Sequence, residues 1–165
     1  MRPFGKLRTP AREGTDVAPF DAAGDRRTIV TIAALLVRDG RALLVRRHAG
    51  HRESPGMWDL PGGYLLDHED DVDAAVLRVV QEELGVLPQS CEFIDTKYAP
   101  LADGEPRVDN LYVVFDWEGE PVAAGGPDHF DGMEWVALDD LINAVAEMVE
   151  PRRSLVRLLL GMDRA

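Results

Sequence analysis

Two neighbouring glutamates near the end of an expected helix are the residues of this chain best suited to metal chemistry. Glu82 and Glu83 close an acidic stretch that begins at Asp67 and holds seven carboxylates. Carboxylate oxygens are the ligands that Mg²⁺ and Mn²⁺ prefer, whereas zinc sites favour sulfur and nitrogen. Magnesium usually keeps waters and completes its shell with substrate phosphates, so the pair indicates a phosphorylated substrate. The alternative interpretation of the same residues is a solubilising acidic surface.

The composition is typical of one folded, acidic domain. The chain has 165 residues, 45% of them hydrophobic, and its 18 basic and 30 acidic side chains give a net charge of −12. Such a charge repels nucleic-acid backbones, so a nucleic-acid duplex is not an expected partner. The longest apolar run, Ile29 to Val37, is too short to cross a bilayer, and residues 1–20 lack the apolar core of a signal peptide. Cys91 is the single cysteine, so no intrachain disulfide can form and a reducing cytoplasmic setting is expected.

The chain is expected to divide into an N-terminal tail, residues 1–27, and one domain, residues 28–165. The tail is interrupted by prolines and glycines and shows no lasting periodicity. Strands are expected at Ile29–Val37, Ala42–Arg47, Glu92–Tyr98, Asn110–Trp117 and Met133–Ala137, and closing helices at Leu138–Met148 and Pro151–Leu160. Strands mixed with a few helices, without strict alternation, predict α/β layers rather than a doubly wound sheet.

The first long helix is expected at Asp71–Leu84. Asp70 or Asp71 can cap its N-terminus, and carboxylates there also suit the helix dipole. Gly85 is the expected left-handed stop at its C-terminus. An apolar stripe along the helix can pack on the sheet; its members are Val72, Val76, Val79 and Val80.

The segment that carries this chemistry resembles the Nudix (MutT-like) hydrolases. The likeness rests on Trp58-Asp59-Leu60-Pro61-Gly62-Gly63, followed by Arg78 and by Glu82-Glu83-Leu84-Gly85-Val86. The family signature is a glycine, five residues, Glu, seven residues, Arg-Glu, an aliphatic residue, any residue, Glu-Glu, any residue, Gly and an aliphatic residue. The likeness covers roughly residues 28–141. It implies an α/β/α sandwich around a mixed β-sheet, with the signature segment forming a loop, a helix and a loop.

The resemblance implies hydrolysis of a diphosphate linkage in a nucleoside diphosphate derivative or a nucleoside triphosphate, by attack of water at phosphorus. It also implies Mg²⁺ or Mn²⁺ as cofactor, held by Glu82, Glu83 and Asp70 and oriented by Arg78. Glu83, Glu82 and Arg78 are therefore the expected catalytic residues. The expected partner is a small nucleotide, no membrane is expected, and the sequence leaves a homodimer open.

Two departures from the signature affect this expectation. Reading forward from Gly63 places the first glutamate at Glu69. Reading back from Arg78 places it at Asp70. Asp70 is preferred because a helix tolerates no extra residue. The loop between Gly63 and Asp70 is then one residue longer than in the signature. Val79 stands where a glutamate is expected, so either another acid substitutes, or activity is low, or the protein binds a nucleotide without hydrolysing it. The candidate additional carboxylates are Glu69, Asp67, Asp71, Asp128 and Asp131.

The expected substrate contacts lie before the helix. Gly62 and Gly63 allow the backbone to approach a ligand closely. Arg47 and Arg52 belong to a basic island that can contact substrate phosphates, and Tyr64 can line the substrate pocket. The alternative for the island is a solvated loop that balances the acidic helix.

Overall fold

The computed structural model describes residues 28–51, 54–66, 68–101, 103–124, 129–148, 150 and 152–161, and the expected tail at residues 1–27 lies outside this part of the chain. The strands of the described part are β1 (Ile29–Arg38), β2 (Arg41–Arg47), β3 (Trp58–Asp59), β4 (Gly62–Tyr64), β5 (Leu87–Tyr98), β6 (Arg107–Glu118) and β7 (Phe130–Ala137). The helices are α1 (Val72–Leu84), α2 (Leu138–Ala144) and α3 (Arg152–Leu159), with a 3₁₀ turn at Val145–Glu147.

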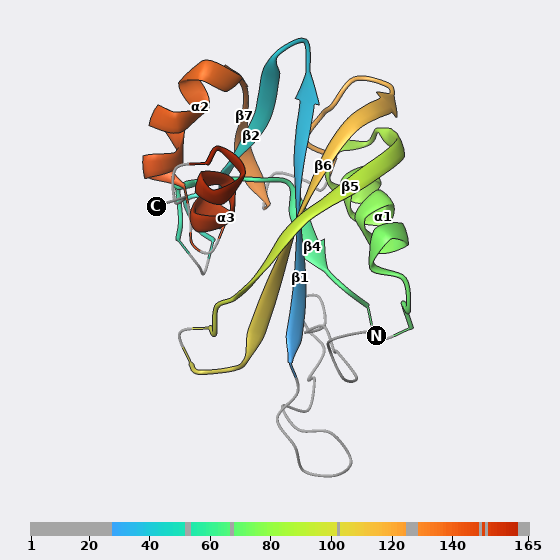
Figure 1. Cartoon of the computed structure of the whole chain (residues 1–165), viewed down its shortest axis with the longest axis vertical. Helices are drawn as coiled ribbons and strands as arrows, with labels where there is room; N and C mark the ends of the chain where they lie inside the picture. Colours follow the sequence, from blue (N-terminus) through green and yellow to red (C-terminus); the bar gives the residue numbers. More distant parts are fainter. Residues whose placement is uncertain are drawn as a thin grey trace.

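The long strand β1 is the centre of a mixed sheet of seven strands among the described residues. It runs parallel to β6 along most of its length, and its first half pairs antiparallel with the short β4. The end of β1 turns back into β2, which pairs with β3 and β7, while β5 pairs antiparallel with β6 (Figure 1). The strand expected at residues 29–37 is therefore confirmed as the spine of the fold.

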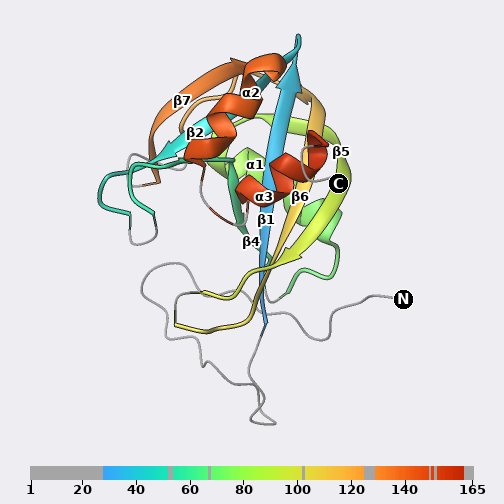
Figure 2. The same cartoon turned by 60° about the vertical axis from the view of Figure 1, so that its left-hand side comes forward.

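Alternate residues of β1 face two separate apolar layers. Ile32 and Ala34 belong to the layer under α1, whereas Ala33 and Leu35 belong to the layer under α2 and α3. Figure 2 shows α2 and α3 in front of the sheet and α1 behind it. A strand covered on both faces must be apolar at every position, which explains the continuous hydrophobic run in the sequence. The expected α/β/α sandwich around a mixed sheet is confirmed.

Helix α1 has the caps that the sequence predicts. The Asp71 carboxylate accepts from the backbone N–H groups of Asp73 and Ala74, so Asp71 is the cap. Gly85 adopts the left-handed conformation, at φ 68°, and ends the helix. Val79 is only 2% exposed and lies in the core beneath the helix, so the expected packing stripe is confirmed.

Several elements differ in length from the sequence prediction: β6 and β7 each begin three residues earlier than expected, at Arg107 and Phe130. Strand β5 begins at Leu87 rather than at Glu92, because an edge strand tolerates Pro88 and the register shifts that follow it. The helix expected at residues 138–148 ends at Ala144 and tightens into the 3₁₀ turn. None of the helices in the described residues has the length and apolar character needed to cross a membrane.

Candidate active site

Arg78 joins the loop before α1 to the helix itself. Its Nη1 donates to Glu82 at 2.9 Å, one turn further along the helix. Its Nη2 donates to the backbone carbonyl of Tyr64 at 2.8 Å and to Glu69 at 2.9 Å, and its Nε also donates to Glu69. This forked geometry is one that guanidinium groups make well and ammonium groups do not. The side chain therefore sets the position of the loop and the direction of Glu82 together, as expected for an orienting residue.

Glu69 is a carboxylate of the loop before α1 that contacts Arg78. Asp70 was preferred because a helix takes no extra residue between that position and Arg78; α1 begins at Val72, so the chain between Glu69 and the helix can also hold the extra residue. Burial alone would raise the pKa of Glu69, but hydrogen bonds from Arg78 and from the Leu66 N–H outweigh it and lower that pKa below 4.5. Asp70 stays a predicted metal ligand on the residue before the cap.

A Glu69→Gln variant is expected to be less stable than the wild type at pH 7, by about 1.5–3 kcal/mol for the lost charge-assisted contacts. A carboxyl with a lowered pKa stabilises the fold above its unfolded pKa of about 4.5, and this contribution is lost as pH falls through the lower folded value. The difference between variant and wild type should therefore shrink below pH 4.5. Urea unfolding between pH 3 and pH 8 measures it, with Glu92→Gln on the exposed side of β5 as control; an unchanged difference at pH 3 would contradict the ion pair.

Glu83 lies at the junction of α1 with the beginning of β7. It is only 9% exposed, and His129 places its Nδ1 3.6 Å from a carboxylate oxygen of Glu83. The carbonyl of His129 accepts from the backbone N–H of His48 at 3.4 Å, and Phe130 pairs with Arg47 across the sheet. The end of β2 and the beginning of β7 therefore meet the last turn of α1. The sequence analysis named Asp128 and Asp131 as candidates but not His129, which lies between them.

The glycine pair of β4 is packed from both sides. A Cβ on Gly62 would lie 2.4 Å from the Ile32 carbonyl oxygen and 2.5 Å from Nη2 of Arg152. A Cβ on Gly63 would lie 3.2 Å from a methyl group of Val79. These contacts give both glycines a structural role in the sheet, while their contact with a ligand stays a prediction. Val79 fills the space beside Gly63 where the family signature has a carboxylate.

Arg47, one of the predicted substrate contacts, lies at the end of β2, where the sequence placed it. Its Nε donates to Asp59 at 2.8 Å, and its side chain is only 14% exposed. Arg46, the neighbouring arginine, pairs with Asp131 at 2.8 Å, so that candidate carboxylate has a cationic partner on β2. Arg46 and Arg47 are adjacent in sequence, but each pairs with a different aspartate. The basic residues in the sequence do not show how these pairs are divided.

The remaining predicted residues fall into two groups. Arg52, Asp67 and Asp128 lie outside the described residues. Tyr64 is 40% exposed at the end of β4, where its carbonyl binds Arg78.

The donor set at the end of α1 suits a cation that the substrate helps to bind. The described part of the chain holds no group of three or more His, Cys, Asp or Glu side chains placed to hold a metal ion. Magnesium, however, is commonly bound through one or two carboxylates together with waters and substrate phosphates. Glu82 and Glu83 supply two hard oxygen ligands, and Val79 removes a third. The residues therefore fit a divalent cation bound together with a phosphorylated ligand rather than a preformed cage.

The comparison with known proteins agrees with this geometry. The model of the NUDIX domain matches residues 25–159. The nucleoside triphosphatase NudI of Klebsiella pneumoniae is 29% identical over 126 residues, which cover 72% of this chain and 86% of that protein. The ADP-ribose pyrophosphatase of Methanocaldococcus jannaschii is 26% identical over 96 residues, 58% of this chain and just over half, 55%, of that protein.

Solved structures give the same result. The crystal structure of a MutT NUDIX hydrolase from Burkholderia pseudomallei is 30% identical, has a TM-score of 0.61, and covers 76% of this chain and 90% of its own. The solution structure of the E. coli ORF135 protein, at 23% identity and a TM-score of 0.67, covers 82% of this chain and 90% of its own and shows the same fold. The chain therefore belongs to the Nudix family, whose enzymes are hydrolases acting on diphosphate bonds.

Proposed function

We propose that this protein is a Mg²⁺- or Mn²⁺-dependent hydrolase that cleaves the diphosphate linkage of a nucleoside diphosphate derivative or a nucleoside triphosphate. The observation that carries the proposal is Arg78, which binds both Glu69 in the loop and Glu82 on α1, next in sequence to the buried Glu83. Relatives named as a nucleoside triphosphatase and an ADP-ribose pyrophosphatase support this substrate class. The single cysteine suits the cytoplasm as the place of this activity.

The residues divide the work as follows. Glu82, Glu83 and Asp70 would hold the cation, which would neutralise charge on the phosphate oxygens. Water attacks phosphorus, a carboxylate of the pair accepts its proton, and the bridging oxygen leaves with the other half of the substrate. Arg78 keeps Glu82 in place during this step. The diphosphate itself is contacted by Arg47 and Arg52, and the rest of the substrate by Tyr64 and by the backbone at Gly62 and Gly63.

The test is turnover of a panel of nucleoside triphosphates, ADP-ribose and nucleotide sugars with Mg²⁺ or Mn²⁺, by the full chain. We expect release of phosphate, pyrophosphate or a nucleoside monophosphate from at least one compound, and loss of that release on adding EDTA. Release no greater than that of a Glu83→Gln variant for every compound would reject the enzyme.

A second candidate function is nucleotide binding without hydrolysis, and the burial of Val79 favours it. Valine at this position supplies no ligand and no base, and it is 2% exposed against Gly63. A protein of this kind would bind members of the same panel with Mg²⁺ and release nothing from them.

A Val79→Glu variant separates the two functions. If existing carboxylates already support hydrolysis, we expect no gain in kcat, whereas an impaired enzyme should gain activity. The unfolding free energy without metal should fall by at least about 2 kcal/mol, because the new carboxylate is buried among apolar groups. Val79→Gln, which matches the shape without the charge, is the control for both measurements. A large gain in kcat for Glu but not for Gln would favour the second function for the natural chain.

A further inference from the structure

His129 brings an imidazole nitrogen to the carboxylate of Glu83. Nδ1 of His129 lies 3.6 Å from Oε1 of Glu83, and the two side chains are 53% and 12% exposed. At that distance the two groups are not hydrogen-bonded to each other, because such bonds between nitrogen and oxygen span about 2.7–3.2 Å. A nitrogen atom and an oxygen atom, each able to bind a metal ion, therefore face each other across a gap beside α1.

The gap is close to the size that a shared cation requires. Two ligands that are each about 2.1 Å from one cation are about 3.0 Å apart at an octahedral angle and about 3.4 Å apart at a tetrahedral one. The observed separation of 3.6 Å would need to close by only about 0.2–0.6 Å. The side chain of His129 is half exposed, so it can make this movement without disturbing the core.

The backbone holds both residues in this relation. Ala124, which precedes β7 in the chain, donates its N–H to the Glu83 carbonyl at 3.0 Å. The carbonyl of His129 accepts from the His48 N–H at 3.4 Å, and the next residue, Phe130, pairs with β2. The imidazole therefore extends from backbone that is attached to the sheet.

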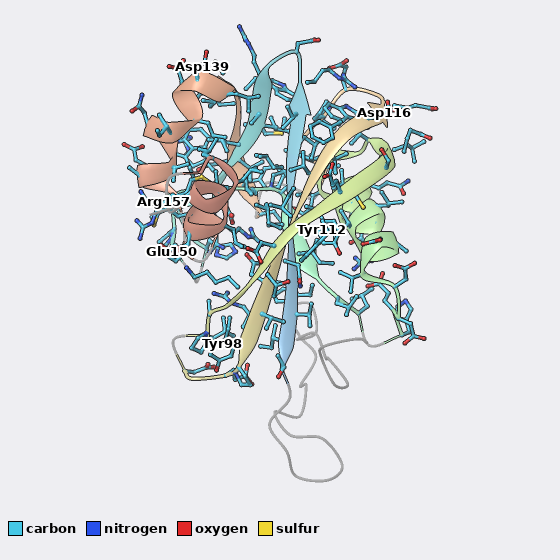
Figure 3. The ribbon with its side chains drawn as sticks, viewed as in Figure 1. Tyr98, Tyr112, Asp116, Asp139, Glu150 and Arg157 are labelled. Carbon is cyan, nitrogen blue, oxygen red and sulfur yellow. The ribbon has the colours of Figure 1, made fainter. Side chains whose placement is uncertain are left out.

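Other charged side chains are less suited to complete this site. Asp131, which the sequence offered as an additional carboxylate, pairs with Arg46 at 2.8 Å. The charged side chains near α3, among them the labelled Glu150 and Arg157, lie across the sheet from α1 (Figure 3). His129 is better placed than these groups to complete the shell of a cation at the end of α1.

Val79 leaves the cation site with one donor fewer than the family signature provides. It precedes Glu83 by one helical turn, so a carboxylate there would share the face of Glu83, whereas the valine is 2% exposed in the core. A nitrogen donor in place of that oxygen changes which cation is favoured. First-row transition-metal cations accept imidazole nitrogen more readily than Mg²⁺, which prefers oxygen.

We propose that Nδ1 of His129 is a ligand of the divalent cation at Glu83, and that this nitrogen makes the site favour Mn²⁺ over Mg²⁺. The inference rests on the proposed function, because it takes from it the cation site at the end of α1. It goes further by adding a ligand from the residue before β7 and by choosing between the two cations.

The first test is electron-spin-echo spectroscopy of the full chain with Mn²⁺ and methylenediphosphonate, a diphosphate analogue that contains no nitrogen and is not hydrolysed. A histidine nitrogen bound to Mn²⁺ modulates the echo, and the modulation changes when the chain carries ¹⁵N-labelled histidine. We expect this modulation in the wild-type chain and its loss in His129→Ala and His129→Asn. The labelled wild-type chain is measured directly, so its result does not depend on the folding of a variant.

The second test is the affinity for the two cations, measured by the EPR signal of free Mn²⁺ and by competition with Mg²⁺, with methylenediphosphonate present. We expect both variants to raise the Kd of Mn²⁺ about tenfold and to change the Kd of Mg²⁺ by no more than about twofold. The control is His51→Ala, which removes a histidine from the loop after β2 and should leave both constants unchanged. Thermal unfolding establishes that each variant is folded.

The outcomes separate this inference from the function beneath it. Mn²⁺ bound without modulation from a histidine nitrogen would overturn the assignment of His129 and leave the proposed function standing. The same conclusion follows if His51→Ala weakens Mn²⁺ binding as much as His129→Ala, or if His129→Ala weakens the binding of both cations equally. A wild-type chain that binds neither cation with methylenediphosphonate and turns over no nucleotide would overturn the proposed function and the inference together.

Discussion

A Glu83→Gln variant is expected to hydrolyse its substrate at least about 100-fold more slowly than the wild type, as measured by kcat at saturating Mg²⁺. Glu83 is the buried carboxylate of the pair, and it lies beside the residues that join α1 to β2 and β7. Glutamine keeps the shape and the contact with solvent but loses the charge that a cation or a proton requires. Thermal unfolding should show that the variant is still folded, because glutamine has nearly the same size and shape as glutamate.

The control for this variant is Glu92→Gln, which removes the same charge from the exposed side of β5. It should retain wild-type kcat and KM. A Glu83→Gln protein that is folded and fully active would remove Glu83 from the chemistry.

An Arg152→Met variant is expected to lose about 3–5 kcal/mol of unfolding free energy, the largest loss of stability from any single replacement proposed for this chain. It would leave Asp59 and Asp109, which are 5% and 1% exposed, buried beside an apolar side chain. Burial alone raises the pKa of Asp59, but Arg152 and Arg47 outweigh it and lower that pKa below 3.8. Asp59 would keep Arg47 as a cationic partner, whereas Asp109 would lose the guanidinium 3.5 Å from it, and a buried carboxylate without a cation is costly to desolvate.

Urea unfolding at pH 7 measures this loss, with Arg153→Met as the matched control at less than about 1 kcal/mol. In the wild type the stabilisation by Asp59 is present above its unfolded pKa of about 3.8 and is lost as pH falls through the lower folded value, so the loss in Arg152→Met should diminish at acid pH. A triple variant that also carries Asp59→Asn and Asp109→Asn should regain part of the loss. Equal stability of Arg152→Met and Arg153→Met would contradict the buried ion pairs.

Local signals made much of the fold predictable. Asp71 and Gly85 cap the two ends of α1, and apolar side chains recur along it with a spacing of about 3.6 residues. The bounds of the helix therefore followed from the sequence. The unbroken apolar run of β1 predicted a strand covered on both faces. The pairing of Arg78 with Glu82 was also predictable, because four residues separate them on one helix.

The rest of the site depends on contacts between distant parts of the chain. Arg152 and Asp59 are 93 positions apart. The sequence does not distinguish Arg152 from the neighbouring Arg153, because only the orientation of the helix decides which of the two is buried. A charged residue between Trp58 and Leu60 was the one sign that Asp59 needs a buried partner. The contact of Arg78 with Glu69 depends on the path of the loop before α1, which residue spacing alone does not define.

The central claim is that Glu82 and Glu83 together bind a divalent cation that carries a diphosphate. Anomalous diffraction from crystals of the full chain grown with Mn²⁺ and a non-hydrolysable nucleoside triphosphate analogue tests it most directly. We predict a manganese peak within about 2.5 Å of carboxylate oxygens from both residues, with a phosphate oxygen of the analogue in the same coordination shell. Bound analogue with no manganese at these two side chains would contradict the claim.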